Sequence, residues 1–488
     1  MAGNEEALAA VILAAGAGSR MRSALPKVLH PVGGEPMIAH VLALAREAGA
    51  ARIVVVVGHG GEEVARRLPD LLPEGAAAAS GEAGALPGAG GHGAPGAAAP
   101  ARPEIVWQHE RRGTGHAVAM AAPLLADFPG DVLVLYGDTP LIRPETVRSM
   151  QDARRAGHAV VVLGFHAAEP GDYGRLVRGA DGTLERIVEA RDATAEERAI
   201  PLCNSGVVLA RARLLFDLLS TLDDDNAAGE IYLTDIVAAA RARGESAAVV
   251  LCPEAETLGV NTRADLARAE AAFQARRRRA LLEAGVTLVA PETVFLARDS
   301  EIAADVVIEP FVVIGPGVKI GPGVHLHSFS RLEGCTIGSG ATIGPHARLR
   351  PGTRIAAGAR VGNFVEIKNA EIGEGAKVNH LSYVGDASVG EAANIGAGTI
   401  TCNYDGVMKH RTEIGPRAFI GSNTALVAPV RVGAEAMTGS GSVVTEDVPD
   451  GALAIARARQ VTKPGFARRL MARLGAMRAR CEKAAGRE

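Results

Sequence analysis

Aromatic side chains, long apolar runs and excess charge of either sign are scarce in this sequence. Phe, Trp and Tyr make up 3% of its 488 residues, and alanine and glycine take up the difference. The formal net charge is −3, so no overall positive field attracts nucleic acid, and we expect none as a partner. No apolar run approaches the roughly 18 residues that span a bilayer. We therefore expect no membrane partner.

Cysteine is also rare, and its positions exclude two further classes of protein. The five cysteines stand far apart in the sequence, at Cys203, Cys252, Cys335, Cys402 and Cys481. Neither a metal-binding Cys-x-x-Cys pair nor a paired disulfide framework is present. Glu5 and Glu6 precede the first apolar run, whereas a signal peptide begins with positive charge. These features predict a cytoplasmic protein.

A repeat six residues long runs from Ile302 to Val444. Its aliphatic positions, separated by a one-residue slip after Leu332, include Ile302, Ile308, Ile314, Ile320, Leu326, Leu332, Ile337, Ile343, Leu349, Ile355, Val361 and Ile367. A period of six fits neither an amphipathic helix nor a simple strand. Gly-rich pieces such as Ile-Gly-Pro-Gly supply corners between short strands. The pattern is typical of the hexapeptide left-handed parallel β-helix.

The N-terminal half has a different pattern, in which apolar strands alternate with helices. We expect strands at Val11–Ala14, 52–58, 105–107, 131–136, 160–165, 206–210 and 247–251, and helices at 36–47 and 262–284. This order predicts a Rossmann-like α/β fold with a parallel sheet. A chain of 488 residues is too long to fold around a single hydrophobic core. We expect an α/β domain over 1–257, a connecting helix over 258–285, the β-helix over 286–456 and a basic C-terminal arm over 457–488.

Two segments have compositions that stand apart from these elements. The Ala/Gly/Pro-rich stretch over 74–103 lacks periodicity and is expected to be a surface insertion without chemistry. Arg276–Arg279 are four adjacent arginines on the predicted connecting helix. They could contact RNA, but a solvated helix face is the favoured interpretation.

The first candidate site begins at the Gly-rich turn after the first strand. Gly16-x-Gly18 lacks the third glycine of a dinucleotide fingerprint, and no Gly-Lys-Ser/Thr follows as in a Walker loop. Backbone N–H groups with Arg20 and Lys27 suit a triphosphate. Asp138 ends a later strand, and a carboxylate there can hold Mg²⁺ against phosphates. Ligands of such sheets lie beyond the carboxyl ends of the strands.

These residues resemble the sugar-1-phosphate nucleotidylyltransferases. The resemblance rests on Leu13-Ala-Ala-Gly-x-Gly-Ser-Arg-Met, Pro26-Lys27, Gln108, Gly113-Thr114, Tyr136-Gly-Asp138, Tyr173-Gly-Arg175, Glu189, Asn204-Ser-Gly206 and Gly259-Val-Asn261. Ser19 and Ser205 stand where threonine is usual, and both keep the hydroxyl. With the hexapeptide domain, the likeness extends to bifunctional members of the family and covers nearly the whole chain.

The resemblance implies a role for each matching residue of the first site. Arg20 and Lys27 would act as catalytic cations on the UTP phosphates, and Asp138 with Asn261 would bind Mg²⁺. Uracil would be recognised by Gln108, Gly113 and the backbone of Leu13, Ala14, Ala15 and Gly16. Thr114 and Tyr136 complete the nucleotide and product site. The sugar would contact Gly174, Glu189, Asn204 and Thr234.

The second candidate site lies where the hexapeptide repeat is interrupted. Asn379-His380-Leu-Ser-Tyr383 places polar residues near a rung, and a loop over 401–410 leaves the coil. Function concentrates in such interruptions. The resemblance makes His380 the general base for acetyl transfer from acetyl-CoA to glucosamine-1-phosphate, a task that suits an imidazole. Backbone N–H groups near Ala397 or Ser422 are candidate oxyanion donors.

The resemblance also implies ligands and partners for this second reaction. The sugar phosphate would be held by Arg350, Lys368, Tyr383, Asn394 and Lys409. The acetyl-CoA groove would be lined by Ala397, Asn403, Tyr404, Ser422, Ser440 and Arg457. The family builds this site between parallel β-helices, so a homotrimer is expected.

Three hypotheses about function are left open by the residues alone. The first is a two-reaction enzyme that acetylates glucosamine-1-phosphate and then transfers UMP from UTP to N-acetylglucosamine-1-phosphate, for synthesis of bacterial cell-envelope precursors. The second is a one-reaction nucleotidylyltransferase whose β-helix only assembles or regulates. The third is a non-enzymatic scaffold. The Asn379-His380-x-x-Tyr383 segment and the 403–406 loop favour the first, and Arg20, Lys27, Asp138 and Asn261 argue against the third.

Overall fold

The structure, a computed structural model, describes residues 7–16, 18–58, 60–71, 102–180 and 182–485. The predicted insertion over 74–103 lies almost entirely outside the described residues. The chain divides into two compact units: one holds 1–284, 290–300 and 314–316, and the other holds 285–289, 301–313 and 317–488. The domain boundaries at 257, 285 and 456 remain a prediction. None of the helices described is long and apolar enough to cross a membrane.

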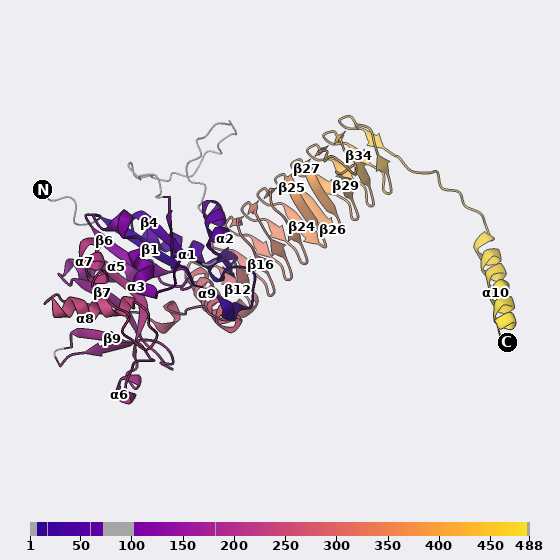
Figure 1. The fold of residues 1–488 in the computed structure, drawn as a ribbon. Helices are drawn as coiled ribbons and strands as arrows, with labels where there is room; N and C mark the ends of the chain where they lie inside the picture. Colours follow the sequence, from indigo (N-terminus) through magenta and orange to yellow (C-terminus); the bar gives the residue numbers. More distant parts are fainter. Residues whose placement is uncertain (1–6, 17, 59, 72–101, 181, 486–488) are drawn as a thin grey trace. The chain divides into compact units, whose positions relative to one another are not determined.

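The first unit is built on a mixed sheet whose strands run through its centre (Figure 1). The central strand β1 (Leu8–Ala14) is fully buried, with β4 and β6 paired parallel to it on either side. The strands follow the order β11 (Ala247–Leu251), β7 (Val160–His166), β10 (Leu202–Arg211), β6 (Asp131–Tyr136), β1, β4 (Ala50–Val57) and β5 (Glu104–Trp107). The Rossmann-like α/β fold expected for this half is confirmed.

Helices cover both faces of the sheet because both faces of its strands are apolar. Alternate residues of β1 enter different cores: Ile12 packs with α1 (Met37–Glu47) and α5 (Pro144–Arg155), whereas Val11 packs with α7 (Ala212–Leu219) and α8 (Ile236–Ala242). This layering leaves the carboxyl ends of β1, β5 and β6 at one edge of the sheet. The first candidate site lies at that edge.

The expectation of a parallel sheet is wrong for β10. This strand pairs antiparallel with β6 and with β7. It enters the sheet from a smaller lobe that holds β8 (Arg175–Arg178), β9 (Leu184–Val188) and α6 (Ala195–Arg198), without the long crossover helix that a parallel connection uses. The lobe therefore delivers the chain to the sheet from the opposite end.

The interpretation of Arg276–Arg279 as a solvated face is wrong for three of the four residues. They lie on α9 (Arg263–Glu283), where Arg276 donates to Leu141 O at 2.8 Å, Arg277 to Ser300 O at 2.7 Å and Arg278 to Val294 O at 2.8 Å. Burial lowers the pKa of each of these three guanidinium groups. Only Arg279 of the run is exposed. The arginines fasten loops of the first unit to α9.

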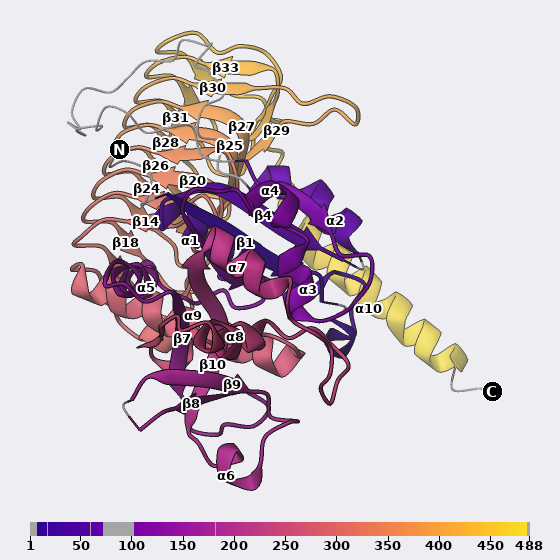
Figure 2. The same ribbon diagram turned by 60° about the vertical axis from the view of Figure 1, so that its left-hand side comes forward.

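The second unit is a left-handed parallel β-helix of short stacked strands (Figures 1 and 2). One face holds β12 (Thr287–Leu288), β15 (Val307–Ile308), β18 (His325–Leu326), β21 (Thr342–Ile343), β24 (Arg360–Asn363), β26 (Lys377–His380), β28 (Asn394–Ile395), β31 (Phe419–Ile420), β34 (Met437–Thr438) and β36 (Leu453–Ala454). Leu326 pairs with Ile308 on one side and Ile343 on the other, so the repeat's aliphatic positions stack as a buried ladder. The predicted fold is confirmed.

The remaining strands of the coil form its other faces. They are β14 (Glu301–Ile302), β16 (Val313–Ile314), β17 (Lys319–Ile320), β19 (Arg331–Leu332), β20 (Cys335–Ile337), β22 (Arg348–Leu349), β23 (Thr353–Ile355), β25 (Glu366–Ile372), β27 (Tyr383–Val389), β29 (Ile400–Cys402), β30 (Thr412–Ile414), β32 (Ala425–Val427), β33 (Val430–Val432) and β35 (Val443–Val444). The arm beyond them carries helix α10 (Phe466–Ala485).

Glycine does not supply every corner of the coil. Phe311, Phe329, His346, Phe364 and Leu381 all have φ between 50° and 64°, the left-handed region that side chains disfavour. They occupy the same corner of successive coils, and the rings of neighbouring residues from Phe311 to Phe364 stack with centroids 4.9 to 5.1 Å apart. We call Phe311, Phe329, His346, Phe364 and Leu381 the corner ladder.

Candidate functional sites

A cavity of about 280 Å³ opens at the carboxyl ends of β1, β5 and β6. It is lined by Leu13, Ala14, Ala15, Gly16, Lys27, Val28, Gln108, Arg111, Gly113, Thr114, Ala117, Tyr136, Asp138 and Glu230. The structure thus brings together every residue predicted for uracil recognition. Gln108 is buried and donates to Gly113 O at 3.1 Å, so its amide is fixed at the cavity wall.

Lys27 joins the two residues predicted to bind a metal ion. Its Nζ forms an ion pair with Asp138 Oδ2 and donates to Asn261 Oδ1 at 3.0 Å. The side chains of Lys27 and Asp138 are only 11% and 18% exposed, so their charges are held close with little water between them. The backbone N–H of Val260 donates to Asp138 O at 3.0 Å. Asp138 Oδ2 and Asn261 Oδ1 therefore come from separate loops and contact the same cation, the Lys27 ammonium.

A second cluster holds the residues predicted to receive the sugar. Thr234 Oγ1 donates to Glu189 Oε1 at 3.1 Å, and Asn204 N donates to Gly174 O at 2.8 Å. A Cβ at position 174 would lie 3.3 Å from the Ile187 side chain and 3.6 Å from Asn204 and Glu189, so a larger residue would press on Ile187 and line the sugar cluster. Burial, assisted by the charges of Asp235 and Asp192, raises the pKa of Glu189.

Tyr136 connects the sugar cluster to the nucleotide cavity. Desolvation and then the charges of Glu189 and Asp138 raise the pKa of its hydroxyl. A Cβ on Gly206 would lie 2.7 Å from the Tyr136 ring. The predicted Asn-Ser-Gly motif therefore ends in glycine because any other residue would clash with this ring. The two clusters are therefore parts of one continuous site.

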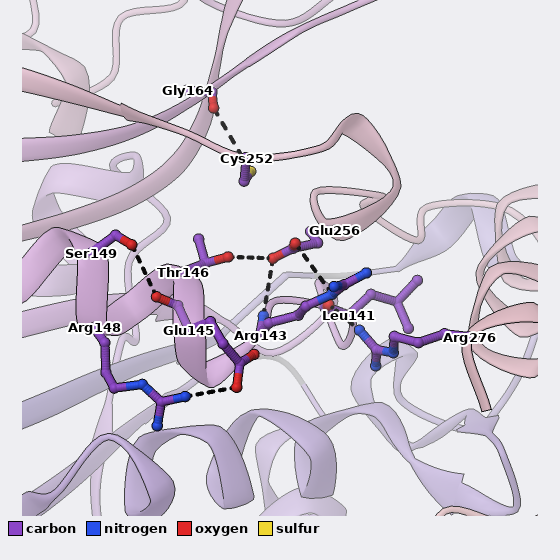
Figure 3. A network of polar contacts seen from close by, with 10 residues as sticks. All are labelled: Leu141, Arg143, Glu145, Thr146, Arg148, Ser149, Gly164, Cys252, Glu256 and Arg276. Carbon is purple, nitrogen blue, oxygen red and sulfur yellow. Dashed lines mark hydrogen bonds and ion pairs between the residues drawn. The ribbon is translucent and has the colours of Figure 1, made fainter. Parts of the chain in front are cut away.

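A polar network holds the loops that carry Asp138 and Asn261 (Figure 3). Glu256 is 4% exposed at its side chain and accepts from Thr146 Oγ1 at 2.7 Å and from Arg143 N at 3.1 Å. Arg276 donates to Leu141 O in the same network. Glu256 thus ties the segment after β6 to the segment before α9. Sequence reasoning did not find Glu256, because a single glutamate in a loop carries no motif.

Arg20 is the predicted catalytic cation of the first site that the structure does not bring to the cavity. It lies in the short 3₁₀ helix η1 (Ser19–Met21), is exposed, and is absent from the cavity lining. Conversely, the lining includes Arg111 and Glu230, which the sequence did not single out. Arg111 follows Gln108 by three residues, and its charge next to the matched motif was the available signal.

His380 is exposed on the β-helix at the end of β26. Its Nδ1 lies 2.7 Å from Asn363 Oδ1, which belongs to the preceding coil and pairs in register with it. An amide oxygen only accepts, so this contact keeps the ring proton on Nδ1 and leaves a lone pair on Nε2. The position can therefore serve a base that faces solvent. Asn363 was missed because it stands 17 residues earlier in the sequence.

The predicted CoA-site residues Ala397, Ser422 and Ser440 share one column with His380. Backbone hydrogen bonds place the four residues on successive coils. Gly398 N donates to His380 O, Asn423 N to Ala397 O and Gly441 N to Ser422 O. Ser422 and Ser440 are exposed, whereas Ala397 is half-buried. The column forms a line of small side chains along the coil. Arg457 is exposed beyond β36.

Three of the predicted sugar-phosphate ligands form a cationic cluster. A side-chain contact with Lys409, the charge of Lys409 and that of Arg350 lower the pKa of Lys368. Arg350 Nη1 also donates to Glu366 Oε1 at 2.8 Å. Cations that crowd in this way favour an anion between them. Tyr383 and Asn394 lie half-buried on β27 and β28.

The loop over 401–410, which leaves the coil, folds as an antiparallel hairpin. Tyr404 and Lys409 form an antiparallel bridge, and Asp405 Oδ1 accepts from the backbone N–H groups of Val407 and Met408. His410 and those N–H groups lower the pKa of Asp405. The amide of Asn403 donates to Asp386, which also accepts from Asn369 at 2.6 Å. The hairpin is therefore fixed at its base while its apolar tip is exposed.

Comparison with known proteins gives the class of each unit. Residues 10–288 match the MobA-like NTP transferase domain. Residues 299–334 and residues 334–369 each match the bacterial transferase hexapeptide family, whose model consists of six repeats. Fold and site together define a nucleotidyltransferase joined to a hexapeptide transferase.

Several relatives that are similar over nearly the whole length are described as bifunctional protein GlmU. The protein of Cereibacter sphaeroides is 59% identical over 94% of this chain and 95% of its own length. That of Dinoroseobacter shibae is 57% identical over 96% and 98%, and that of a Jannaschia species is 55% identical over 96% and 97%. The chain belongs to the bifunctional GlmU family. It is an enzyme with a nucleotidyltransferase and an acyltransferase activity.

Proposed function

We propose that the chain makes UDP-N-acetylglucosamine in two steps, one in each unit. The amine of glucosamine-1-phosphate first takes the acetyl group of acetyl-CoA in the β-helix. The resulting N-acetylglucosamine-1-phosphate then receives UMP from UTP in the α/β unit, and pyrophosphate leaves. The observation that carries the proposal is the presence, in one chain, of the Lys27–Asp138–Asn261 cluster and of His380 held by Asn363.

In the uridylyl step, positioning and charge neutralisation do most of the work. The sugar phosphate oxygen attacks the α-phosphorus in line, so no covalent enzyme intermediate is needed. Gln108, Gly113 and the backbone of Leu13–Gly16 hold the base against the cavity wall. Glu189, Asn204, Gly174 and Thr234 orient the sugar. Lys27 neutralises phosphate charge at the cavity. Arg20 is exposed and outside the cavity lining, and we assign it as a second cation on the family resemblance.

The residues around Lys27 also fit Mg²⁺. Asp138 and Asn261 offer a carboxylate and an amide oxygen, which Mg²⁺ prefers as ligands, and the lysine ammonium shows that both oxygens can face one cation. When bound, Mg²⁺ supplies charge neutralisation to the phosphates. Lys27 is then available to the phosphate oxygens.

In the acetyl step, His380 acts as the general base. Because Asn363 holds the proton on Nδ1, Nε2 can accept a proton from the substrate amine as it attacks the thioester carbonyl. The C–S bond then breaks, and the CoA thiolate leaves and takes up a proton. Arg350, Lys368 and Lys409 bind the sugar phosphate, and Tyr383 and Asn394 contact the sugar. Acetyl-CoA extends along Ala397, Ser422 and Ser440, with Asn403, Tyr404 and Arg457 at its sides. Backbone N–H groups near Ala397 or Ser422 stabilise the oxyanion.

The working assembly that we propose is a homotrimer. Its support is exposed apolar surface: Phe311, Phe329, Phe364 and Leu381 of the corner ladder are 53% to 61% exposed. Val407 and Met408 at the hairpin tip are 87% and 62% exposed. Contiguous apolar surface of this kind typically marks an interface.

We place the enzyme in the cytoplasm, in the synthesis of bacterial cell-envelope precursors. All five cysteines lie within the described residues and are free thiols, which fits a reducing compartment.

The test is to supply the purified chain with glucosamine-1-phosphate, acetyl-CoA, UTP and Mg²⁺ and to follow both products. Asp138→Ala should abolish uridylyl transfer and retain acetylation. His380→Ala should lose about 10²- to 10⁴-fold in acetylation and retain uridylyl transfer. Wild-type protein that forms only UDP-sugar would support a one-reaction enzyme, and formation of neither product would contradict the proposal.

A further inference from the structure

A cluster of metal-ligand side chains lies on the first coils of the β-helix, in a part of the chain that neither reaction uses. His325 Nε2 is 3.0 Å and His327 Nδ1 is 2.8 Å from the same oxygen, Glu309 Oε1. All three atoms lie within 4.8 Å of one another. Within the described residues, this is the one group of three or more His, Cys, Asp or Glu side chains that is close enough to hold a metal ion.

The β-helix itself creates this arrangement. Side chains two apart on a strand share one face, so His325 and His327 both point outward while Leu326 between them is buried. The N–H of Glu309 donates to Leu326 O at 2.9 Å, so Glu309 stands one coil before His327. Figure 2 labels β18, the strand that contributes His325. Three ligands from two adjacent coils are thus fixed by backbone hydrogen bonding.

The carboxylate is already oriented by a second set of donors. Ser328 donates to Glu309 Oε2 through its N–H at 3.0 Å and its Oγ at 3.1 Å, which turns Oε1 toward the two rings. Burial opposes ionisation of Glu309, but the Ser328 and His327 hydrogen bonds outweigh it and lower the pKa of Glu309 to about 2. The ligand is therefore anionic at neutral pH. Such outer contacts fix the geometry of metal ligands in proteins.

We propose that Glu309, His325 and His327 bind one divalent transition-metal ion of the zinc class. Two imidazoles and one carboxylate match the preferred ligands of zinc, whereas Mg²⁺ and Ca²⁺ prefer oxygen alone. Bonds of about 2.0–2.1 Å place neighbouring ligand atoms roughly 3.3 Å apart in a tetrahedron. The two ring nitrogens lie 3.0 and 2.8 Å from Glu309 Oε1, so each needs to move only slightly away from that oxygen. The side chains of His325, His327 and Glu309 are 41%, 29% and 29% exposed, which leaves the fourth position to water.

Binding of the ion exchanges hydrogen bonds for metal bonds. In the structure both ring nitrogens that face Glu309 Oε1 act as donors to it. Each nitrogen gives up its proton, either to solvent or by transfer to the other nitrogen of its ring, and then offers its lone pair to the metal. The bound ion would join two coils near the start of the β-helix. This proposal is independent of both transferase sites.

The experiment uses the full chain without a histidine tag, stripped with a chelator and titrated with Zn²⁺ by calorimetry. Wild-type protein should bind one Zn²⁺ that the His325→Ala/His327→Ala double variant does not bind. Ser328→Ala should bind it on the order of 10- to 100-fold more weakly. His166→Ala removes an exposed histidine outside the cluster and should leave binding unchanged. Asp138→Ala, which removes the other candidate cation ligand, should retain this Zn²⁺.

Two further measurements separate loss of the site from loss of the fold. The double variant should keep uridylyl transfer and its circular dichroism spectrum, and if it does not fold, Glu309→Gln and His327→Gln replace it. Bound Co²⁺ should give visible absorption bands in wild-type protein that disappear in Glu309→Gln. Equal Zn²⁺ binding by wild type and the cluster variants, or no Zn²⁺ binding by wild type, would overturn the proposal.

Discussion

Asn363 determines which nitrogen of His380 can act. The histidine was found from the sequence because it interrupts the repeat, but its partner was not, since the contact crosses from one coil to the next. A histidine without this neighbour would distribute its proton between both ring nitrogens. The orientation of the proposed base is thus set by two coils and not by one residue.

Replacement of Asn363 tests this interpretation. Asn363→Ala should lower the rate of acetyl transfer by less than His380→Ala does, because the base remains but its tautomer is no longer fixed. Asn363→Asp keeps an acceptor for Nδ1–H and adds a charge that favours the imidazolium, so the acidic limb of the pH–rate profile should move to higher pH. Steady-state kinetics over a range of pH checks both. An unchanged profile in both variants would contradict the role of Asn363.

The cationic cluster of Arg350, Lys368 and Lys409 predicts how the stability of the protein depends on pH. Because the pKa of Lys368 lies below its ordinary 10.5 in the folded chain, the unfolded chain binds more protons between the folded pKa and 10.5, and stability rises with pH across that window. At lower pH the repulsion is fully present, and a bound anion relieves it.

Inorganic phosphate should therefore raise the melting temperature of the wild-type protein at neutral pH. The increment should shrink as pH rises through the pKa of Lys368 in the folded chain, which lies below 10.5, and should be smaller in Lys409→Ala. Thermal melts with phosphate and with chloride at matched ionic strength make the comparison. An equal increment in the wild type and in Lys409→Ala would show that phosphate binds elsewhere.

Individual elements were predicted better than their connections. The strand at 131–136 has the expected bounds because its apolar run defines it. Helix α9 differs from its predicted range by one residue at each end, and the capping box of Thr262 and Asp265 fixes its start. The direction of β10 was missed, since direction depends on the route by which the chain enters the sheet. The inward use of Arg276–Arg278 was missed because their carbonyl acceptors come from distant loops.

The hydrogen bonds of Glu256 predict that this residue stabilises the loop after β6. Glu256→Ala leaves Arg143 N–H and Thr146 Oγ1 without their acceptor, and should lower the free energy of unfolding by about 2–4 kcal/mol. It should also slow uridylyl transfer through displacement of Asp138 and Asn261, while acetylation persists. Urea unfolding and the two activity assays test this.

Glu145 provides the matched control within the same network (Figure 3). Its carboxylate pairs with Arg148 at 2.7 Å, and both side chains are mostly exposed, at 68% and 58%. Glu145→Ala should therefore change the free energy of unfolding by at most about 1 kcal/mol. If the two alanine variants were equally stable, the burial of Glu256 would not matter to the fold.

At the scale of the whole molecule, the period of six was enough to predict the β-helix, because only stacked coils make such a period useful. The sequence could not show that aromatic residues adopt positive φ at its corners. Stacking of the rings from Phe311 to Phe364 offsets a backbone conformation that each residue alone would avoid. The exposed apolar area that results supports the proposed homotrimer, which the family resemblance implied.

Sedimentation equilibrium should find three chains of 50.1 kDa in one particle. Phe329→Asp places a charge between Phe311 and His346 of the corner ladder and should shift the mass toward one chain, with loss of acetylation and retention of uridylyl transfer. Leu251→Asp changes a residue that is 48% exposed on the α/β unit and should leave the mass unchanged. A monomeric wild-type protein with full acetylation would refute the assembly.

The column that runs from His380 through Ala397 and Ser422 to Ser440 sets a length. Its three steps are spacings between hydrogen-bonded strands, about 4.8 Å each, so the base and the last serine are separated by about 14 Å. Substitutions along the column can change what lies beside an acyl donor, but not this span, because main-chain pairing fixes it. In the proposed acetyl-CoA site, main-chain pairing therefore sets the length that a bound thioester spans, and a donor of different length would require a coil to be added or removed.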